Sequence, residues 1–276
     1  MEISRLSEAL TCDPVTGIWR SDRVAPVAYP EGDHATCFGV EDSSFWFRHR
    51  NRCILAAVQR YRPDGFILDV GGGNGYVSRA VIDAGFEAVV LEPGPEGARN
   101  ARHGRRIPDV ICATLGEAAL RAGTVPAVGM FDVLEHVEDD HGVVAQLHRI
   151  LRPRGYVYLT VPSFHWLWSG ADVDAMHFRR YTRATLAAVF EKYFDITYLT
   201  ALFGRTVPAI LVGRTVPYAL GFQRHRTARQ FAAEHRAGGS AVSSFIERML
   251  AHEIGRINRG ASQRIGSTIL MVARRR

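Results

Sequence analysis

The sequence predicts an α/β fold with a doubly wound, mainly parallel sheet of seven strands, and three observations support it. Apolar runs of strand length alternate with segments of helical periodicity between residues 66 and 161. The first run leads directly into a glycine-rich turn, and a last apolar run at 267–273 suits a final sheet strand. Strands separated by helical crossovers pair in parallel, with helices on both faces. Ligands of such sheets bind beyond the carboxyl ends of the strands.

The chain before the sheet divides into an irregular segment and a helix. In residues 1–41, prolines and glycines recur between short alternating stretches, which indicates loops and at most a hairpin. Residues 45–61 carry apolar side chains at helical spacings. Asp42-Ser43-Ser44 offers a cap before this segment and Pro63-Asp64-Gly65 a stop after it, so a helix is expected here.

The elements of the sheet follow in order. We expect strands at 66–70, 87–91, 110–112, 127–131 and 156–161, with helices at 76–84, 97–103, 116–122 and 139–151. An aromatic and charged connection then reaches Tyr181, followed by a helix at 183–193 with Thr182 as its cap and a strand at 195–199. Each short apolar run is bounded by glycine, proline or charged residues, as strand ends require.

A helical insertion separates the sixth strand from the last. It contains Gly-Arg-Thr-Val-Pro twice, at 204–208 and 213–217, and the two prolines are expected to begin short helices. A segment at 241–257 has one apolar helical face and fits either core docking or an interface with lipid. The predicted organisation is an irregular segment 1–41, a ligand-binding domain 42–201 and 263–276, and an arginine-rich helical insertion 202–262.

The positive charge is concentrated near the C-terminus. Formal net charge is +6, yet residues 1–201 carry 21 basic and 25 acidic residues, whereas residues 202–276 carry 13 arginines and 3 acids. Such asymmetry favours an anionic partner for the C-terminal segment, such as a phosphate-bearing substrate or a membrane surface. A solvated arginine-rich face is the structural alternative.

Composition also excludes several classes of protein. Lys192 is the only lysine among 34 basic residues, so a Walker phosphate loop, which needs Gly-Lys-Ser/Thr, is absent. The four cysteines lack Cys-x-x-Cys spacing and the first residues lack the pattern of a signal peptide, which predicts a reducing, cytoplasmic setting. No uncharged apolar run approaches the roughly 18 residues of a membrane span, although contact with the inner face of a membrane stays open.

The glycine-rich turn is the most informative segment. Ile67-Leu-Asp-Val-Gly-Gly-Gly-Asn-Gly-Tyr76 runs from an expected strand into an expected helix, and its glycines permit positive φ and close approach of a ligand to the backbone. Their G-x-G-x-G spacing lacks the third glycine of the dinucleotide fingerprint, which suits a ligand without a pyrophosphate. Glu92 ends the second strand, where a carboxylate can accept both hydroxyls of a ribose.

Together with Asp132-Val-Leu-Glu-His-Val-Glu-Asp139 and Leu151-Arg-Pro-Arg-Gly-Tyr156, these motifs resemble the class I S-adenosylmethionine-dependent methyltransferases. The resemblance spans about residues 42–200 and 266–276 and implies a Rossmann-like fold and S-adenosylmethionine as methyl donor, with S-adenosylhomocysteine as product. It assigns the methionine part to Asp69 and the turn (Gly71, Gly73, Asn74, Gly75), the ribose to Glu92 beside Pro93, the adenine to Thr114 and Leu115, and the floor to Asp132, Val133, His136 and Val137. An acid usual near the adenine amine is replaced here by Ala113-Thr114.

A closer resemblance is to bacterial ubiquinone-biosynthesis and polysaccharide-cluster methyltransferases. It is carried by Phe45-Trp-Phe-Arg-His-Arg-Asn51 and by Trp168 through His177-Phe-Arg-Arg-Tyr-Thr182. Trp46 and Arg50 share a helix face and could close over the cofactor and pair its carboxylate, or serve only in packing. Some relatives begin with a zinc ribbon, but Cys12, His34 and Cys37 form a weak ligand set, so no metal is expected.

The connection after the fifth strand is the expected acceptor pocket. Its aromatic side chains, Phe164, Trp166 and Trp168, suit a flat ring, a sugar face or an isoprenoid chain. His165, His177 and His136 are candidate bases for a hydroxyl acceptor, because imidazole can take a proton near neutral pH. Arg179, Arg180 and Tyr181 either bind substrate or shape the loop. The expected acceptor is a small molecule, glycan or lipid-linked compound, with anionic groups and a membrane contact through 202–262 as open possibilities.

Two other functions compete with methyl transfer. An NAD-binding oxidoreductase would share the glycine turn and Glu92, but the third fingerprint glycine is missing, and neither Tyr181 nor Tyr193 has a lysine four residues on. A non-catalytic RNA- or membrane-binding protein on a methyltransferase-like scaffold would explain the basic segment, although nucleic acid is not the expected partner. The acceptor atom and the oligomeric state are left open.

Overall fold

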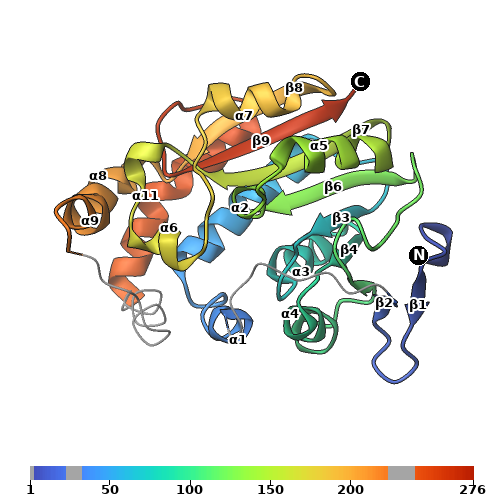
Figure 1. The fold of residues 1–276 in the computed structure, drawn as a ribbon. Coiled ribbons are helices and arrows are strands. Elements are labelled where there is room, and N and C mark those ends of the chain that lie inside the picture. Colours follow the sequence, from blue (N-terminus) through green and yellow to red (C-terminus); the bar gives the residue numbers. More distant parts are fainter. Residues whose placement is uncertain (1–2, 23–32, 223–239) are drawn as a thin grey trace.

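Buried strands paired in parallel form the centre of the sheet (Figure 1). The computed structural model describes residues 3–22, 33–222 and 240–276, and in them the strand order is β1-β2-β5-β4-β3-β6-β7-β9-β8. The strands are β1 (Leu10–Cys12), β2 (Trp19–Ser21), β3 (Ile67–Val70), β4 (Ala88–Leu91), β5 (Val110–Cys112), β6 (Val125–Phe131), β7 (Leu151–Pro162), β8 (Phe194–Leu202) and β9 (Thr268–Arg275). The predicted class, a doubly wound and mainly parallel α/β sheet, is confirmed.

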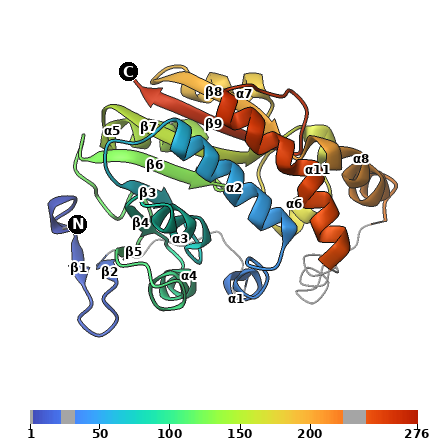
Figure 2. The same ribbon diagram turned by 180° about the vertical axis from the view of Figure 1, so that it is seen from behind.

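Alternation along the central strands sorts their side chains between two layers of helices. On β3, Ile67 belongs to the core under α2 (Phe45–Arg60), α3 (Tyr76–Asp83) and α11 (Ser240–Arg259), whereas Leu68 belongs to the core under α5 (Asp140–Ile150) and α7 (Arg183–Phe190). Figure 1 shows α5 and α7 in front of the sheet, and Figure 2, seen from the opposite side, shows α2 and α11 in front of it, so the two pairs cover opposite faces. Burial on both faces explains why these strands read as continuous apolar runs.

The remaining helical elements are short. They are η1 (Ile3–Arg5), α1 (Asp33–Phe38), α4 (Pro95–Arg99), η2 (Asn100–Gly104), η3 (Leu134–His136), η4 (His165–Leu167), α6 (Gly170–Asp174), η5 (Gly204–Thr206), α8 (Val207–Ile210), η6 (Leu211–Thr215) and α9 (Val216–Ala219). The helix expected at 116–122 is wrong. Thr114 and Glu117 instead close a turn through reciprocal side-chain bonds to backbone N–H groups, and Ala119 takes a left-handed φ of 44°.

In the described part of the chain the sheet has nine strands instead of the expected seven, because the N-terminal segment forms a hairpin that joins the sheet. β1 pairs antiparallel with β2, and β2 pairs in parallel with β5 through Trp19 and Ile111. Asp13 organises the connecting turn by accepting hydrogen bonds from the Val15 N–H and the Thr16 hydroxyl. The sequence predicts an irregular segment here with at most a hairpin, and the place of this hairpin beside β5 depends on contacts that no local pattern encodes.

The opposite end of the sheet is antiparallel. β9 lies between β7 and β8 and pairs antiparallel with both. The register of β8 shifts between Ile196 and Tyr198, where one strand carries an extra residue relative to its partner. The final strand expected at 267–273 is therefore confirmed, and it runs opposite to both of its neighbours.

The described parts of the insertion are helical, as expected. Pro208 and Pro217 each lie in the first turn of a short helix, α8 and α9, where the missing N–H costs no hydrogen bond. Of the two options for the segment 241–257, core docking is observed, because α11 buries Leu250 and Ile257 against the layer formed by α2. Among the described residues, no helix is both long and apolar enough to cross a membrane.

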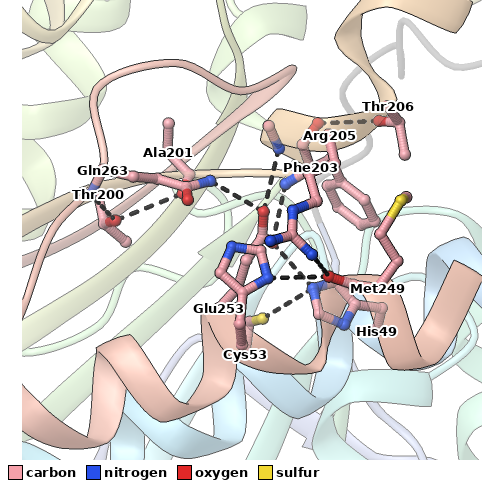
Figure 3. A network of polar contacts seen from close by, with 12 residues as sticks. His49, Cys53, Thr200, Ala201, Phe203, Arg205, Thr206, Met249, Glu253 and Gln263 are labelled. Atoms are coloured by element: carbon pink, nitrogen blue, oxygen red, sulfur yellow. Dashed lines mark hydrogen bonds and ion pairs between the residues drawn. The ribbon is translucent and has the colours of Figure 1, made fainter.

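A closed network of hydrogen bonds fastens α11 to α2 and to the end of β8 (Figure 3). The carboxylate of Glu253 is buried and accepts bonds from the backbone N–H groups of Phe203 and Gly204 at 2.9 and 3.0 Å. The imidazole of His49 and the amide of Gln263 complete its partners at 2.9 and 2.8 Å. These bonds hold the pKa of Glu253 below its usual value despite burial, so the charge is compensated within the network.

Glu253→Ala should lower the free energy of unfolding by about 3–5 kcal/mol, because it leaves several buried donors without an acceptor. Urea denaturation followed by circular dichroism measures this loss. Glu247→Ala is the matched control on the same helix: its partners Arg48 and Arg52 are partly exposed, so the loss should stay near about 1 kcal/mol. Equal losses for the two variants would show that the network does not anchor α11.

Candidate functional site

The predicted ligand-binding residues gather where the parallel strands end. Val70 pairs with Leu91, Leu91 pairs with Ile111, and Phe131 pairs with Thr160, so the residues that follow these strands share one edge of the sheet. These are the glycine turn after β3, Glu92 after β4, Ala113 and Thr114 after β5, and Asp132 after β6. This edge is the ligand-binding side of doubly wound sheets.

The glycine turn adopts the conformation that the sequence predicts. Gly71, Gly73 and Gly75 have φ values of 68°, 53° and 76°, which side chains with a Cβ rarely adopt. A Cβ at Gly73 would meet no atom within 4 Å, so the backbone there is open to an approaching ligand, whereas one at Gly71 would lie 2.7 Å from Val133. The turn thus has an open side at Gly73 and a closed side against the predicted floor.

Glu92 is joined directly to this turn. Its Oε2 accepts the N–H of Gly73 at 2.8 Å, and its Oε1 accepts the N–H of Gly94 at 2.6 Å. The side chain is buried, and burial raises the pKa of its carboxyl to about 7. Each carboxylate oxygen keeps a further lone pair, which can accept a ribose hydroxyl. The residues present therefore fit an adenosine ligand at this position.

His34 is a neighbour of Glu92 that sequence reasoning missed. Its Nε2 lies 3.6 Å from Oε1 of Glu92, and its ring packs over Gly94 and Gly97. The only pattern considered for His34 was a zinc set with Cys12 and Cys37. Among the described residues these three do not bring their ligand atoms together, since His34 lies against Glu92 and Cys12 is exposed on β1. No local spacing signals the observed contact.

Asp69 and Asn74, predicted to contact the methionine part, have internal partners. Asp69 accepts a hydrogen bond from the Ser78 hydroxyl at 2.7 Å, and burial raises its pKa to about 6. The amide of Asn74 donates to the carbonyl of His34 at 2.9 Å and to Glu41 at 3.1 Å. Both side chains therefore brace the turn, and their direct contact with a ligand stays a prediction.

Arg50 and Trp46 lie together above the floor. The guanidinium of Arg50 pairs with the carboxylate of Asp132 and lies 4.9 Å from the centre of the Trp46 ring. Trp46 stacks on Phe203, with ring centres 5.8 Å apart. Within the described residues the buried Nε of Arg50 has no hydrogen-bond partner. Arg50 is thus positioned beside Asp132, and its predicted pairing with a ligand carboxylate stays untested.

The loops after β4 and β5 form the expected adenine side. The carbonyl of Pro93 is 3.7 Å from the Cys112 sulfur, which ties these two loops together. The N–H of Thr114 is occupied by Glu117, and Leu115 packs partly buried against the main core. Contacts of Thr114 and Leu115 with adenine therefore remain predictions, with Glu117 as an acid near this loop that sequence reasoning did not single out.

The floor after β6 places two of the three predicted bases side by side. Asp132 takes a left-handed φ of 56° and accepts the Thr160 hydroxyl at 3.1 Å, and the chain turns into η3 and on to Val137. The rings of His136 and His177 meet edge to face at 4.7 Å between centres. Burial, with His177 as a lesser cause, lowers the pKa of His136 to about 4, so this imidazole is neutral at physiological pH.

Glu135 and Asp172 complete this cluster; they lie in the predicted floor and acceptor connection, but neither was assigned a role of its own. Glu135 is buried, and burial together with the nearby Asp132 raises its pKa well above the usual value. Asp172 is also buried and accepts bonds from His177 Nδ1 at 3.0 Å and Arg180 Nε at 2.7 Å. The capping pattern Ser169-x-x-Asp172 was the only sequence signal for a fixed carboxylate here.

The other predicted acceptor residues separate into an exposed rim and a structural support. Phe164 and Trp166 stack with ring centres 5.2 Å apart, and His165 is exposed with its ring 5.4 Å from Trp168. Tyr181 is buried and donates to Asp140 at 2.8 Å, so its side chain belongs to the core. Arg179 pairs with Asp140, and Arg180 pairs with Asp172, which supports the loop-shaping role over direct substrate binding for both.

Comparison with known proteins identifies a shared domain. Residues 46–198 match the family model of a methyltransferase domain. The "Probable S-adenosylmethionine-dependent methyltransferase" of Mycolicibacterium smegmatis is 25% identical over 62% of this chain and 66% of its own length. The ubiquinone biosynthesis O-methyltransferase of Xanthomonas axonopodis pv. citri is 29% identical over 37% of this chain and 45% of its own length. The chain thus spans less than two thirds of either relative.

Solved structures share the fold at low sequence identity. A SAM-dependent methyltransferase of Thermotoga maritima superposes with a TM-score of 0.56 at 15% identity, covering 88% of this chain and 95% of that one. Phosphoethanolamine N-methyltransferase 2 of Haemonchus contortus, solved with S-adenosyl-L-methionine, gives 0.51 at 15% identity, covering 80% and 52%. These likenesses establish a Rossmann-like fold with extra strands.

The raised pKa of Glu92 predicts a pH-dependent affinity for S-adenosylhomocysteine. Ribose hydroxyls donate to the ionised carboxylate, so the ligand favours the charged form, whose fraction falls as the pH drops through about 7. Between about pH 8 and about pH 6 the affinity should fall roughly tenfold, measured by calorimetry. Glu92→Ala should stay folded and bind more weakly with no such dependence. An unchanged affinity in this variant would refute the ribose role.

Proposed function

The chain belongs to the S-adenosylmethionine-dependent methyltransferase family, and from this we propose that it transfers the methyl group of S-adenosylmethionine to an oxygen of its acceptor. Bound in the site, the cofactor supplies an electrophilic methyl group on a sulfonium. The protein's task is then to hold the acceptor oxygen in line with the methyl carbon and the sulfur. Alignment of this kind contributes about 7–11 kcal/mol to lowering a barrier.

One observation carries the cofactor assignment: the buried Glu92 carboxylate is bonded to the open glycine of the turn. The Gly73 N–H bond fixes the carboxylate beside the point where a ligand can approach the backbone. A nucleoside that reaches Gly73 therefore finds an acceptor pair for its ribose hydroxyls already in place. We assign the ribose to Glu92 and the methionine part to the side of the turn facing Arg50 and Asp132.

The charge of the site supports a sulfonium ligand over a dinucleotide. Asp69 lies in β3, Glu92 follows β4 and Asp132 follows β6, so three carboxyl groups come together at this edge, and Arg50 pairs with Asp132. A positive sulfonium is attracted to such a set, whereas the pyrophosphate of NAD is repelled. Together with the missing fingerprint glycine, this argues against the alternative of an NAD-binding oxidoreductase.

We place the acceptor oxygen beside His136 and His177, where the loop after β7 meets the floor. The N–H of Phe178 donates to the carbonyl of Glu135 at 2.8 Å, which holds the two segments together. The acceptor hydroxyl gives its proton to water or to a neighbouring imidazole, and an oxygen lone pair forms the bond to the methyl carbon. The carbon–sulfur bond breaks with its electron pair going to sulfur, which leaves neutral S-adenosylhomocysteine. The stack of half-buried Phe164 and exposed Trp166 suits a ring or sugar face on the acceptor.

The insertion offers a surface for an anionic or lipid-linked acceptor. Val212, Val216 and Leu220 are exposed and recur every four residues, so they share one helical face, and Phe222 is exposed just beyond them. Nearby in the fold, Arg205 and Arg248 line an open hollow of about 440 Å³ together with Phe245 and Met249. Apolar side chains next to arginines suit a lipid surface with anionic headgroups.

S-adenosylhomocysteine should stabilise the protein, whereas NAD should not. At a concentration of 100 times Kd, a ligand that binds only the folded state adds about 2.7 kcal/mol, which a thermal shift assay detects. Methyl transfer from labelled S-adenosylmethionine to lipid and glycan fractions then tests the acceptor class. Stabilisation by NAD, or no shift with S-adenosylhomocysteine in a protein that binds RNA, would reject the methyltransferase proposal.

The protein should float with vesicles that contain anionic lipid. Leu220→Ser removes a side chain whose burial contributes about 1.5–3 kcal/mol, so partitioning to these vesicles should fall roughly tenfold or more. Val15→Ser is the matched control, because Val15 is also an exposed apolar residue but lies in the turn between β1 and β2. Identical flotation with neutral and anionic vesicles, or equal loss in the two variants, would contradict the membrane contact.

A further inference from the structure

Three potential metal ligands lie together on the acceptor side of the site. One oxygen of Glu135 and one ring nitrogen each of His136 and His177 lie within 4.8 Å of one another. Two imidazoles and one carboxylate at this spacing form the ligand set of open metal sites, which keep positions for water or substrate. We propose that these three residues bind a divalent transition-metal ion of the zinc or iron class.

The environment of the Glu135 carboxyl group indicates that it binds a ligand. Its side chain is 1% exposed, and within the described residues its Oε2 has no hydrogen-bond partner. A buried carboxylate oxygen without a partner is costly, and native proteins rarely leave one in that state. A cation at the centre of the cluster would compensate this oxygen directly.

His177 has the support that metal-binding histidines require. Such histidines give one ring nitrogen to the metal while the other N–H donates to a carboxylate. Here Nδ1 of His177 is 3.0 Å from Asp172, and Asp172 is itself held by Arg180 through two bonds of 2.7 and 3.1 Å. The arrangement fixes the ring and leaves Nε2 as the nitrogen available to an ion.

A second group of potential metal ligands in the fold differs from this cluster, because all of its carboxylate oxygens have hydrogen-bond partners. His49, Cys53 and Glu253 are also buried and close together. There, however, the two oxygens of Glu253 already accept four hydrogen bonds, so the group is satisfied without an ion (Figure 3). The unpartnered oxygen of Glu135 distinguishes the cluster on the acceptor side.

The position of the ion on the acceptor side suits it to activate the acceptor hydroxyl, a role that rests on the proposed function. A hydroxyl oxygen bound to a divalent cation has a lowered pKa and loses its proton to water more readily. In this arrangement His136 and His177 act as ligands and not as the bases that the sequence suggested. Binding of the ion itself does not depend on methyl transfer.

Cobalt(II) titration tests the site, because cobalt replaces zinc and its visible absorption reports the ligands. The protein, stripped with a chelator, should take up one Co²⁺, and excess Zn²⁺ should abolish the absorption. Glu135→Gln and His177→Ala should each remove tight binding, while Asp172→Asn should weaken it about 10–100-fold through loss of the supporting carboxylate. His141→Ala, which removes an exposed histidine of α5, should bind like the wild type.

The controls separate this inference from the proposed function. Each variant is checked for its melting temperature and for binding of S-adenosylhomocysteine, which Glu135→Gln should retain. Wild-type protein that binds no Co²⁺ or Zn²⁺, or folded Glu135→Gln and His177→Ala that bind as tightly as wild type, would overturn the metal site. Either result alongside intact S-adenosylhomocysteine binding would leave methyl transfer standing.

Discussion

Acidic side chains crowd the edge where the parallel strands end, and much of the surrounding structure serves to hold that charge. Asp69 accepts a hydrogen bond from the Ser78 hydroxyl, and Glu92 accepts two bonds from backbone N–H groups. Asp132 forms an ion pair with Arg50. Each solution uses a different segment of chain: a helix, the glycine turn and its neighbouring loop, and α2. The parallel register therefore brings several buried carboxyl groups to one edge, where leaving them without partners would be costly. The elements around the site are held in place by the hydrogen bonds and the ion pair that compensate these groups.

The insertion is also held by hydrogen bonds to a buried carboxylate, that of Glu253. Glu253 sits on α11, far along the chain from His49 on α2, and its carboxylate also receives the first N–H groups after β8. Through Phe203, which follows β8, this anchor reaches the Trp46 ring beside Arg50. The arginine-rich segment is thus joined to the ligand-binding side by packing and hydrogen bonds, although its sequence suggests only a basic appendage.

Sequence reasoning succeeded where the physical cause was local. The G-x-G-x-G turn, the carboxylate at the end of the second predicted strand and the succession of central strands along the chain all follow from residues adjacent in the sequence. It failed for contacts that depend on how irregular segments fold. His34 comes from a distant part of the chain to lie against Glu92. Asp172 is close in sequence to His177 and Arg180, but no regular spacing predicts that it binds both. Glu135 was passed over for a different reason, since its neighbour His136 drew attention as a base while burial, which distinguishes Glu135, is a property of the fold.

The two borders of the sheet bear on how the protein avoids pairing with other chains. At one border the hairpin covers β5 and ends in β1, a strand of three residues that offers little length for another chain to pair with. At the other border, β8 is interrupted by its shifted register near Ile196 and carries an exposed pair between Asp195 and Arg276. A sheet of nine strands, wide enough to invite edge-to-edge aggregation, is thereby closed at each end by a different device.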